Sequence, residues 1–120
     1  MALRIHHIVL DCVDASRVAT FWSEVLGRDV LPDASADAAF IGAGEAGEPG
    51  WLFFSVPEPK TAKNRMHVDF ESADRDAEVE RLLALGATRV ADHDEWDTRW
   101  TVLQDPEGNE FCVSQRPAGD

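Results

Sequence analysis

Two histidines hold matching places in two similar stretches of this sequence, and their chemistry is the first to consider. His7 lies in RIHHIVLDCV and His67 lies in NRMHVDF, each just before an Ile or Val in a β-rich run. Imidazole nitrogens bind divalent metals, and they also serve as hydrogen-bonding groups. The two histidines therefore indicate either metal ligands or polar groups on a ligand-binding wall.

A thiol is the third candidate, in the stretch DPEGNEFCV at residues 105–113. Its Pro and Gly predict a turn, and alternation in the strand that follows places Phe111 and Val113 on one face and Glu110 and Cys112 on the other. As a thiolate, Cys112 could join the two histidines in a catalytic zinc site. A nucleophilic cysteine is a further alternative, although no orienting third group is recognisable.

Tryptophans and a phenylalanine could line a pocket beside these groups. Trp51 and Phe53 share one face of a predicted strand, Trp100 begins another strand, and Trp96 sits in an acidic loop. Aromatic rings with nearby acids suit a planar, cationic small molecule through stacking and cation attraction. The alternative is that these rings belong to the core or to a dimer interface.

The elements that must position these groups occur twice. A strand at 4–13 and a helix at 15–26 are matched by a strand at 65–71 and a second helix that ends at Gly86. The interval from His7 to His67 recurs from Asp14 to Asp74 and from Val30 to Val90, and the interval from Gly27 to Gly86 is one position shorter. Each half predicts a βαβββ module, at about 4–56 and 65–115, within a single domain over residues 1–120.

Charge and composition limit the classes of partner that this protein is expected to bind. Acidic residues outnumber basic ones 23 to 11, which gives a net charge of −12 and disfavours nucleic acid and anionic membranes. No run approaches the roughly 20 apolar residues of a spanning helix, and the start lacks signal-peptide features, so a cytoplasmic protein is expected. Two cysteines, Cys12 and Cys112, provide no disulfide framework, and we expect free thiols.

The chain resembles the vicinal oxygen chelate superfamily, which includes glyoxalase I, extradiol dioxygenases, fosfomycin-resistance enzymes and bleomycin-resistance proteins. The resemblance rests on HHIVLDCVD, VLGRDV, NRMHVDFESADRDAEVERLLALGATRV and DPEGNEFCV, and it extends to the glyoxalase-like subgroup. It implies an α+β fold in which two βαβββ modules form a cupped, barrel-like mixed sheet with helices outside. It also implies a small-molecule ligand and a homodimer.

The resemblance also implies a ligand set for one divalent metal ion, which would be zinc, iron, nickel or manganese. The strand-one histidines of the family correspond to His7 and His67, and its last-strand carboxylates correspond to Phe53 and Cys112. Both carboxylates are absent, so the metal set reduces to His7, His67 and Cys112.

The absence of both carboxylates leaves three candidate functions. The first is a small-molecule-binding protein with a degraded metal site. The second is a metal-dependent lyase, isomerase or dioxygenase that uses His7 and His67, and the third is an antibiotic-sequestering resistance protein. The sequence leaves open whether the chain is an enzyme. The expected ligand wall consists of His7, Trp51, Phe53, His67, Trp100 and Cys112.

Overall fold

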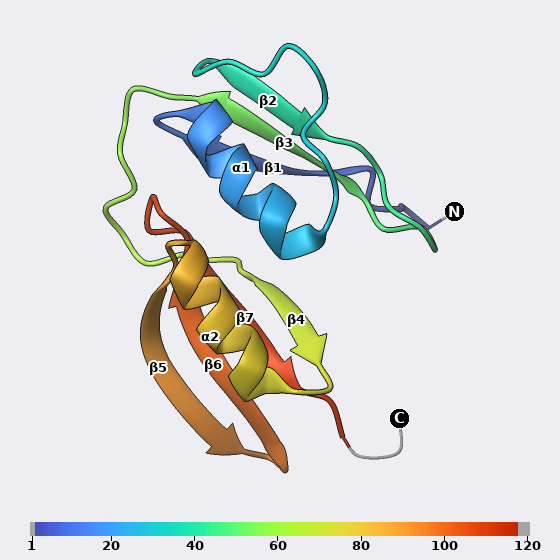
Figure 1. The fold of residues 1–120 in the computed structure, drawn as a ribbon, viewed down its shortest axis with the longest axis vertical. Coiled ribbons are helices and arrows are strands. Elements are labelled where there is room, and N and C mark those ends of the chain that lie inside the picture. Colours follow the sequence, from blue (N-terminus) through green and yellow to red (C-terminus); the bar gives the residue numbers. More distant parts are fainter. Residues whose placement is uncertain (1, 118–120) are drawn as a thin grey trace. The chain divides into compact units, whose positions relative to one another are not determined.

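Within residues 2–117, the part of the chain that the computed structural model describes, seven strands and two helices form two units that divide between Pro59 and Lys60 (Figure 1). The first unit holds β1 (His7–Cys12), α1 (Ala15–Leu26), β2 (Ala38–Ile41) and β3 (Gly50–Ser55). The second holds β4 (Val68–Ser72), α2 (Arg75–Leu85), β5 (Thr88–Glu95), β6 (Thr98–Gln104) and β7 (Glu110–Gln115). The α+β class and the repeated order of elements confirm the predicted fold. No helix in this part of the chain is long and apolar enough to cross a membrane.

The first unit is a three-stranded sheet with α1 against one face. Its strand order is β1-β3-β2, with β1 parallel and β2 antiparallel to β3. Of the three strands that the predicted βαβββ order places after the first helix, one is reduced to a single bridge between Val30 and Ile41. Pro32 follows shortly after Val30 and has no amide hydrogen to extend the pairing.

Alternation along β1 and β3 builds the core of this unit. The register pairs Ile8 with Trp51 and Leu10 with Phe53, so these side chains share the helix-facing side of the sheet. Trp51 stacks on Trp22 of α1 with ring centroids 4.7 Å apart, and both rings are almost fully buried. The large aromatic rings therefore bind the helix to its sheet.

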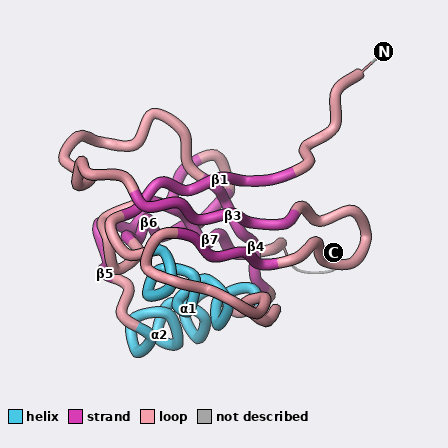
Figure 2. The backbone as a smooth tube through the Cα atoms, turned by 90° about the horizontal axis from the view of Figure 1, so that it is seen from above, coloured by secondary structure: helices cyan, strands magenta, loops and turns pink. Residues whose placement is uncertain are grey.

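The second unit is a four-stranded sheet with α2 on one face, as Figure 2 shows for each helix and its own sheet. Its strand order is β4-β7-β6-β5, with β4 parallel to β7 and the other neighbours antiparallel. Phe111 and Val113 of β7 are buried with Val79 and Leu82 of α2 and Leu103 of β6. Both sheets are open, with edge strands on each side, and neither closes into a barrel.

The predicted turn before β7 is confirmed and is held by Asp105, which is 2% exposed. Its Oδ1 accepts hydrogen bonds from the backbone amides of Glu107 at 2.9 Å and Asn109 at 3.0 Å. Its Oδ2 accepts from Asn109 Nδ2 at 2.9 Å. Gly108 adopts a φ of +89°, a conformation that other residues rarely tolerate. The buried carboxylate thereby fixes where β7 begins.

Both helices begin and end as the repeat predicts. Asp14 accepts a hydrogen bond from the Arg17 amide at 3.2 Å, and Asp74 accepts one from the Ala77 amide at 3.1 Å. The helices end at Gly27 and Gly86, both in the left-handed region. Each module therefore uses the same capping chemistry at the same place.

These caps generate the first prediction. Asp14→Ala and Asp74→Ala should each lower the free energy of unfolding by about 1 kcal/mol, because each leaves a first-turn amide without its acceptor. Urea denaturation provides the measurement, and Asp14→Asn and Asp74→Asn, which keep a capping oxygen, are the matched controls. Alanine variants as stable as the asparagine variants would contradict the assignment of the caps.

Candidate functional site

The face of the second sheet that lies opposite α2 gathers most of the chemical side chains. The register pairs Cys112 of β7 with Asp69 of β4 on one side and with Val102 of β6 on the other. Paired residues in a sheet share a face, and His67 joins them because it lies two positions before Asp69. Trp100 is on the same face, since it pairs with Ser114, two positions after Cys112.

Three of these side chains converge on one point. His67 Nδ1 lies 3.0 Å from Asp69 Oδ1 and 3.8 Å from Cys112 Sγ. The three donor atoms all lie within 4.8 Å of one another. Cys112 is buried, whereas the His67 side chain is 41% and the Asp69 side chain 66% exposed. The cluster thus has a buried sulfur at its base and an open side toward solvent.

The geometry disfavours a cysteine nucleophile. In a Cys-His-Asp arrangement, one ring nitrogen faces the thiol and the other faces the carboxylate. Here the same atom, His67 Nδ1, is the one nearest to both Cys112 and Asp69. Burial raises the pKa of the Cys112 thiol to about 12, and the negative charge of Asp69 acts in the same direction. The thiol is therefore protonated at neutral pH unless a cation lies beside it.

The same convergence suits a metal ion. Ligand distances of about 2.0 to 2.3 Å at tetrahedral angles place the donor atoms of a zinc site roughly 3.3 to 3.6 Å apart. Two of the three observed separations, 3.0 and 3.8 Å, bracket that range, and all three lie within 4.8 Å. Small rotations of His67 and Asp69, both exposed, would bring their donors to those spacings. The nitrogen, oxygen and sulfur donors present therefore fit a divalent ion with an open coordination position.

Glu110 shares this face but serves another purpose. Its carboxylate accepts a hydrogen bond from the Asn64 amide at 2.9 Å and pairs with Lys63 Nζ at 3.0 Å. Its side chain is only 8% exposed. The amide of Asn64 and the ammonium of Lys63 hold the pKa of Glu110 below its ordinary value. Glu110 therefore anchors the segment that leads into His67.

An aromatic stack lies on the same side of the sheet, on the β5–β6 hairpin. His93 pairs with Trp100 across the two strands, with ring centroids 4.9 Å apart and planes inclined by 22°. Trp96 stacks on Trp100 at 6.0 Å and 7°. These three rings form a stack on the sheet face that also carries the His67–Asp69–Cys112 cluster, with Val102 of β6 between Trp100 and Cys112.

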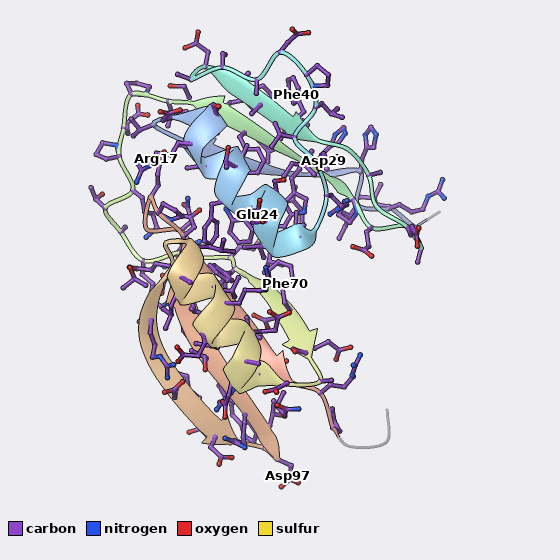
Figure 3. All side chains as sticks on the ribbon, in the orientation of Figure 1. Arg17, Glu24, Asp29, Phe40, Phe70 and Asp97 are labelled. Atoms are coloured by element: carbon purple, nitrogen blue, oxygen red, sulfur yellow. The ribbon has the colours of Figure 1, made fainter. Side chains whose placement is uncertain are left out.

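The tip of this hairpin is strained. Trp96 and its neighbour Asp97, labelled in Figure 3, have φ values of +52° and +57°. A two-residue turn of this kind normally takes Asn-Gly, because other residues resist positive φ. Trp96 is also 84% exposed. The sequence placed Trp96 in an acidic loop, but only the hairpin register brings its ring onto Trp100.

In the first unit, the predicted wall residues separate between two faces. His7 lies opposite Gly50 on the face away from α1, whereas Trp51 and Phe53 are on the helix side and almost fully buried. The prediction that Trp51 and Phe53 share a face with His7 is therefore wrong by one position along the strand. The parallel pair of Ile8 with Trp51 in the first unit corresponds to the parallel pair of Val68 with Phe111 in the second. That correspondence makes Leu52, and not Phe53, the counterpart of Cys112.

His67, Cys112 and Trp100 are candidate site residues from the sequence, but Asp69 is not among them. The register of β4 with β7 is what brings the Asp69 carboxylate beside Cys112. His93 is not named from the sequence either. The usable signal was its position two residues after Ala91, which places both side chains on the same face of a polar strand. The joint ligand wall of His7, His67 and Cys112 stays a prediction.

Comparison with known families identifies the chain. A family model described as a glyoxalase-like domain matches residues 7–114, so the chain belongs to the glyoxalase-like domain family. This confirms the resemblance to the vicinal oxygen chelate superfamily. No curated protein matches the sequence at a significant level.

Solved structures share the fold at low sequence identity. A glyoxalase/bleomycin resistance protein/dioxygenase family enzyme from Burkholderia phytofirmans PsJN is 18% identical with a TM-score of 0.76, and the match covers 94% of this chain and 98% of that chain. A mutant of the fosfomycin resistance protein FosX from Listeria monocytogenes, complexed with Mn(II) and a dihydroxypropylphosphonic acid, is 16% identical with a TM-score of 0.78, covering 98% and 94%. Lactoylglutathione lyase from Agrobacterium tumefaciens is 19% identical with a TM-score of 0.67, covering 96% and 95%.

The anchoring role of Glu110 predicts a dependence of stability on pH. A carboxylate whose pKa is lowered by folding stabilises the protein above its unfolded pKa, and this contribution is lost as the pH falls through the folded value. The stability advantage of wild type over Glu110→Gln should therefore shrink between neutral pH and about pH 3. Urea denaturation at both pH values measures it, with Glu71→Gln as the control for loss of an exposed carboxylate. An advantage that stays constant would contradict the anchor.

The burial of Trp51 predicts a structural role. Trp51→Ala should cost roughly 3–5 kcal/mol of unfolding free energy, because it opens a cavity against Trp22. Trp100→Ala, at a half-buried ring on the open face, should cost clearly less. Denaturant unfolding of both variants provides the comparison. Equal losses, or a small loss for Trp51→Ala alone, would contradict the assignment of Trp51 to the core.

Proposed function

We propose that this protein binds a small molecule through one divalent metal ion held by His67, Asp69 and Cys112. The observation that carries the proposal is the convergence of Nδ1, Oδ1 and Sγ within 4.8 Å on the open face of the second sheet. This cluster keeps two residues of the expected metal set, and Asp69 supplies an oxygen donor in place of the family carboxylate that this chain lacks at position 112. Three protein ligands and an open side are the arrangement of catalytic zinc sites.

Each group has a role in this proposal. A bound divalent ion would supply Lewis acidity and polarise an oxygen of the ligand. His67 and Asp69 hold and orient the site from the exposed side, and Cys112 closes it from below. His67 Nδ1 and Asp69 Oδ1 lie 3.0 Å apart, at hydrogen-bonding distance. The stack of His93, Trp100 and Trp96, in which the Trp96 ring is largely exposed, offers aromatic contacts for the remainder of the ligand.

Metal content bears on whether the protein is an enzyme of this family or a metal-free binding protein. A lyase, an isomerase or a dioxygenase of this family would each need the ion to bind the reacting oxygens, so metal content separates these enzymes from a pure binder. The resistance proteins and lyase among the structural relatives act on small molecules by their names, which supports a ligand of that size. The expected homodimer and cytoplasmic location stay predictions.

Elemental analysis of untagged protein, purified without chelator, tests the proposal. Wild type should contain close to one equivalent of a divalent metal, and His67→Ala, Asp69→Asn and Cys112→Ser should each contain far less. His93→Ala, a histidine of the same sheet face outside the cluster, is the matched control and should keep its metal. The melting temperature of His67→Ala should stay near that of wild type, because its ring is partly exposed.

A wild type that remains metal-free after metals are added back would contradict the proposal. It would favour a second candidate, a metal-free binding protein of the antibiotic-sequestering kind. The observation behind that candidate is the stack of His93, Trp100 and Trp96, with a tryptophan held almost fully exposed at a strained turn. A sequestering protein would protect its drug stoichiometrically and leave it chemically unchanged.

A further inference from the structure

The position of Cys112 determines which donor any ion in this cluster must meet. β7 is an inner strand of the second sheet, paired with β4 on one side and with β6 on the other. Cys112 is 5% exposed and is flanked in register by Asp69 and Val102. A side chain fixed in this way has little freedom to turn out of the site. An ion that reaches His67 and Asp69 therefore also contacts the sulfur.

The sulfur of Cys112 changes which metal ions the site prefers. Thiolate is a soft donor that selects zinc and similar ions, whereas manganese and magnesium prefer sites built from carboxylate, carbonyl and water oxygens. Asp69 supplies one carboxylate here, and Glu110, the nearby second carboxylate, is occupied by Lys63 and the Asn64 amide. The cluster therefore offers a hard ion one carboxylate and offers a soft ion a complete three-ligand site.

We propose that Cys112 makes the His67–Asp69–Cys112 cluster a zinc site that discriminates against manganese and magnesium. This inference rests on the proposed function, since it presumes that the cluster binds metal, and it adds which class of ion is bound and which residue selects it. At almost any site with nitrogen and oxygen ligands, zinc binds more tightly than manganese. The decisive quantity is therefore the change in the zinc-to-manganese affinity ratio when the sulfur is replaced.

The experiment uses full-length protein, stripped of metal and titrated separately with Zn²⁺, Mn²⁺ and Co²⁺. Wild type is compared with Cys112→Asp, which exchanges sulfur for a carboxylate, and with Cys112→Ser, which removes the thiol with the least change in size. Cys112→Asp should lower the zinc-to-manganese affinity ratio by roughly tenfold or more. Circular dichroism of each variant establishes that it is folded before titration.

Cobalt provides a readout that does not depend on activity. Wild type with one equivalent of Co²⁺ should show an intense near-ultraviolet charge-transfer band from thiolate to metal, because the sulfur is a direct ligand. Cys112→Ser should lose the band. Asp69→Asn should keep it at saturating Co²⁺ while binding the ion more weakly, because the sulfur remains.

The possible failures are distinguishable. Cobalt bound at one equivalent without the band, or an unchanged zinc-to-manganese ratio in Cys112→Asp, would overturn the role of Cys112 and leave the proposed metal site standing. A wild type that binds none of the three ions would overturn the metal site and this inference together.

Discussion

The parallel pairing of β4 with β7 is the constraint on which the candidate site depends. Its register sets Asp69 beside Cys112, and the alternation of β4 carries His67 to the same face. The turn around buried Asp105 fixes where β7 begins. The hydrogen bonds that Glu110 accepts from Lys63 and the Asn64 amide fix the segment that leads into β4. A shift of one residue in either strand would move its donors to the helix side.

The two modules use the same scaffold for different purposes. In both, a capped helix covers one face of a sheet through large apolar side chains, which are Trp51 and Phe53 in the first unit and Phe111 in the second. The opposite faces differ in chemistry. The second unit carries the nitrogen, oxygen and sulfur donors, whereas the first has Leu52 at the position that corresponds to Cys112. Within the residues described, the three-donor cluster belongs to the second unit alone.

The aromatic stack and the His67–Asp69–Cys112 cluster are linked by the sheet that carries both. Val102 pairs with Cys112, and Trp100 follows two positions away on the same face of β6. A ligand that coordinates at the cluster could therefore extend along β6 toward the rings. The strained turn at Trp96 sets the far limit of this surface, and strain of this kind is typical of sites where function outweighs local preference.

Local chemistry was enough to predict much of this protein. Periodicity, capping residues and the internal repeat predicted the helices, the principal strands and the α+β class, because these depend on neighbours close in the chain. The turn before β7 was predictable for the same reason, since Asp, Pro and Gly act within a few residues. His67 and Cys112 were candidate donors from their residue types, the place of His67 in the repeat and the family resemblance.

Other features depended on tertiary structure. Asp69 became a donor because two parallel strands that are distant in the sequence, β4 and β7, place it opposite Cys112. Trp51 and Phe53 were assigned to the ligand side from an offset that was wrong by one, and only the packing of Trp22 against Trp51 decides that they face α1. The sequence by itself determined which elements form and which donors exist. Which face each side chain occupies was decided by strand register, because one residue of shift exchanges the two faces and local propensity is the same for both.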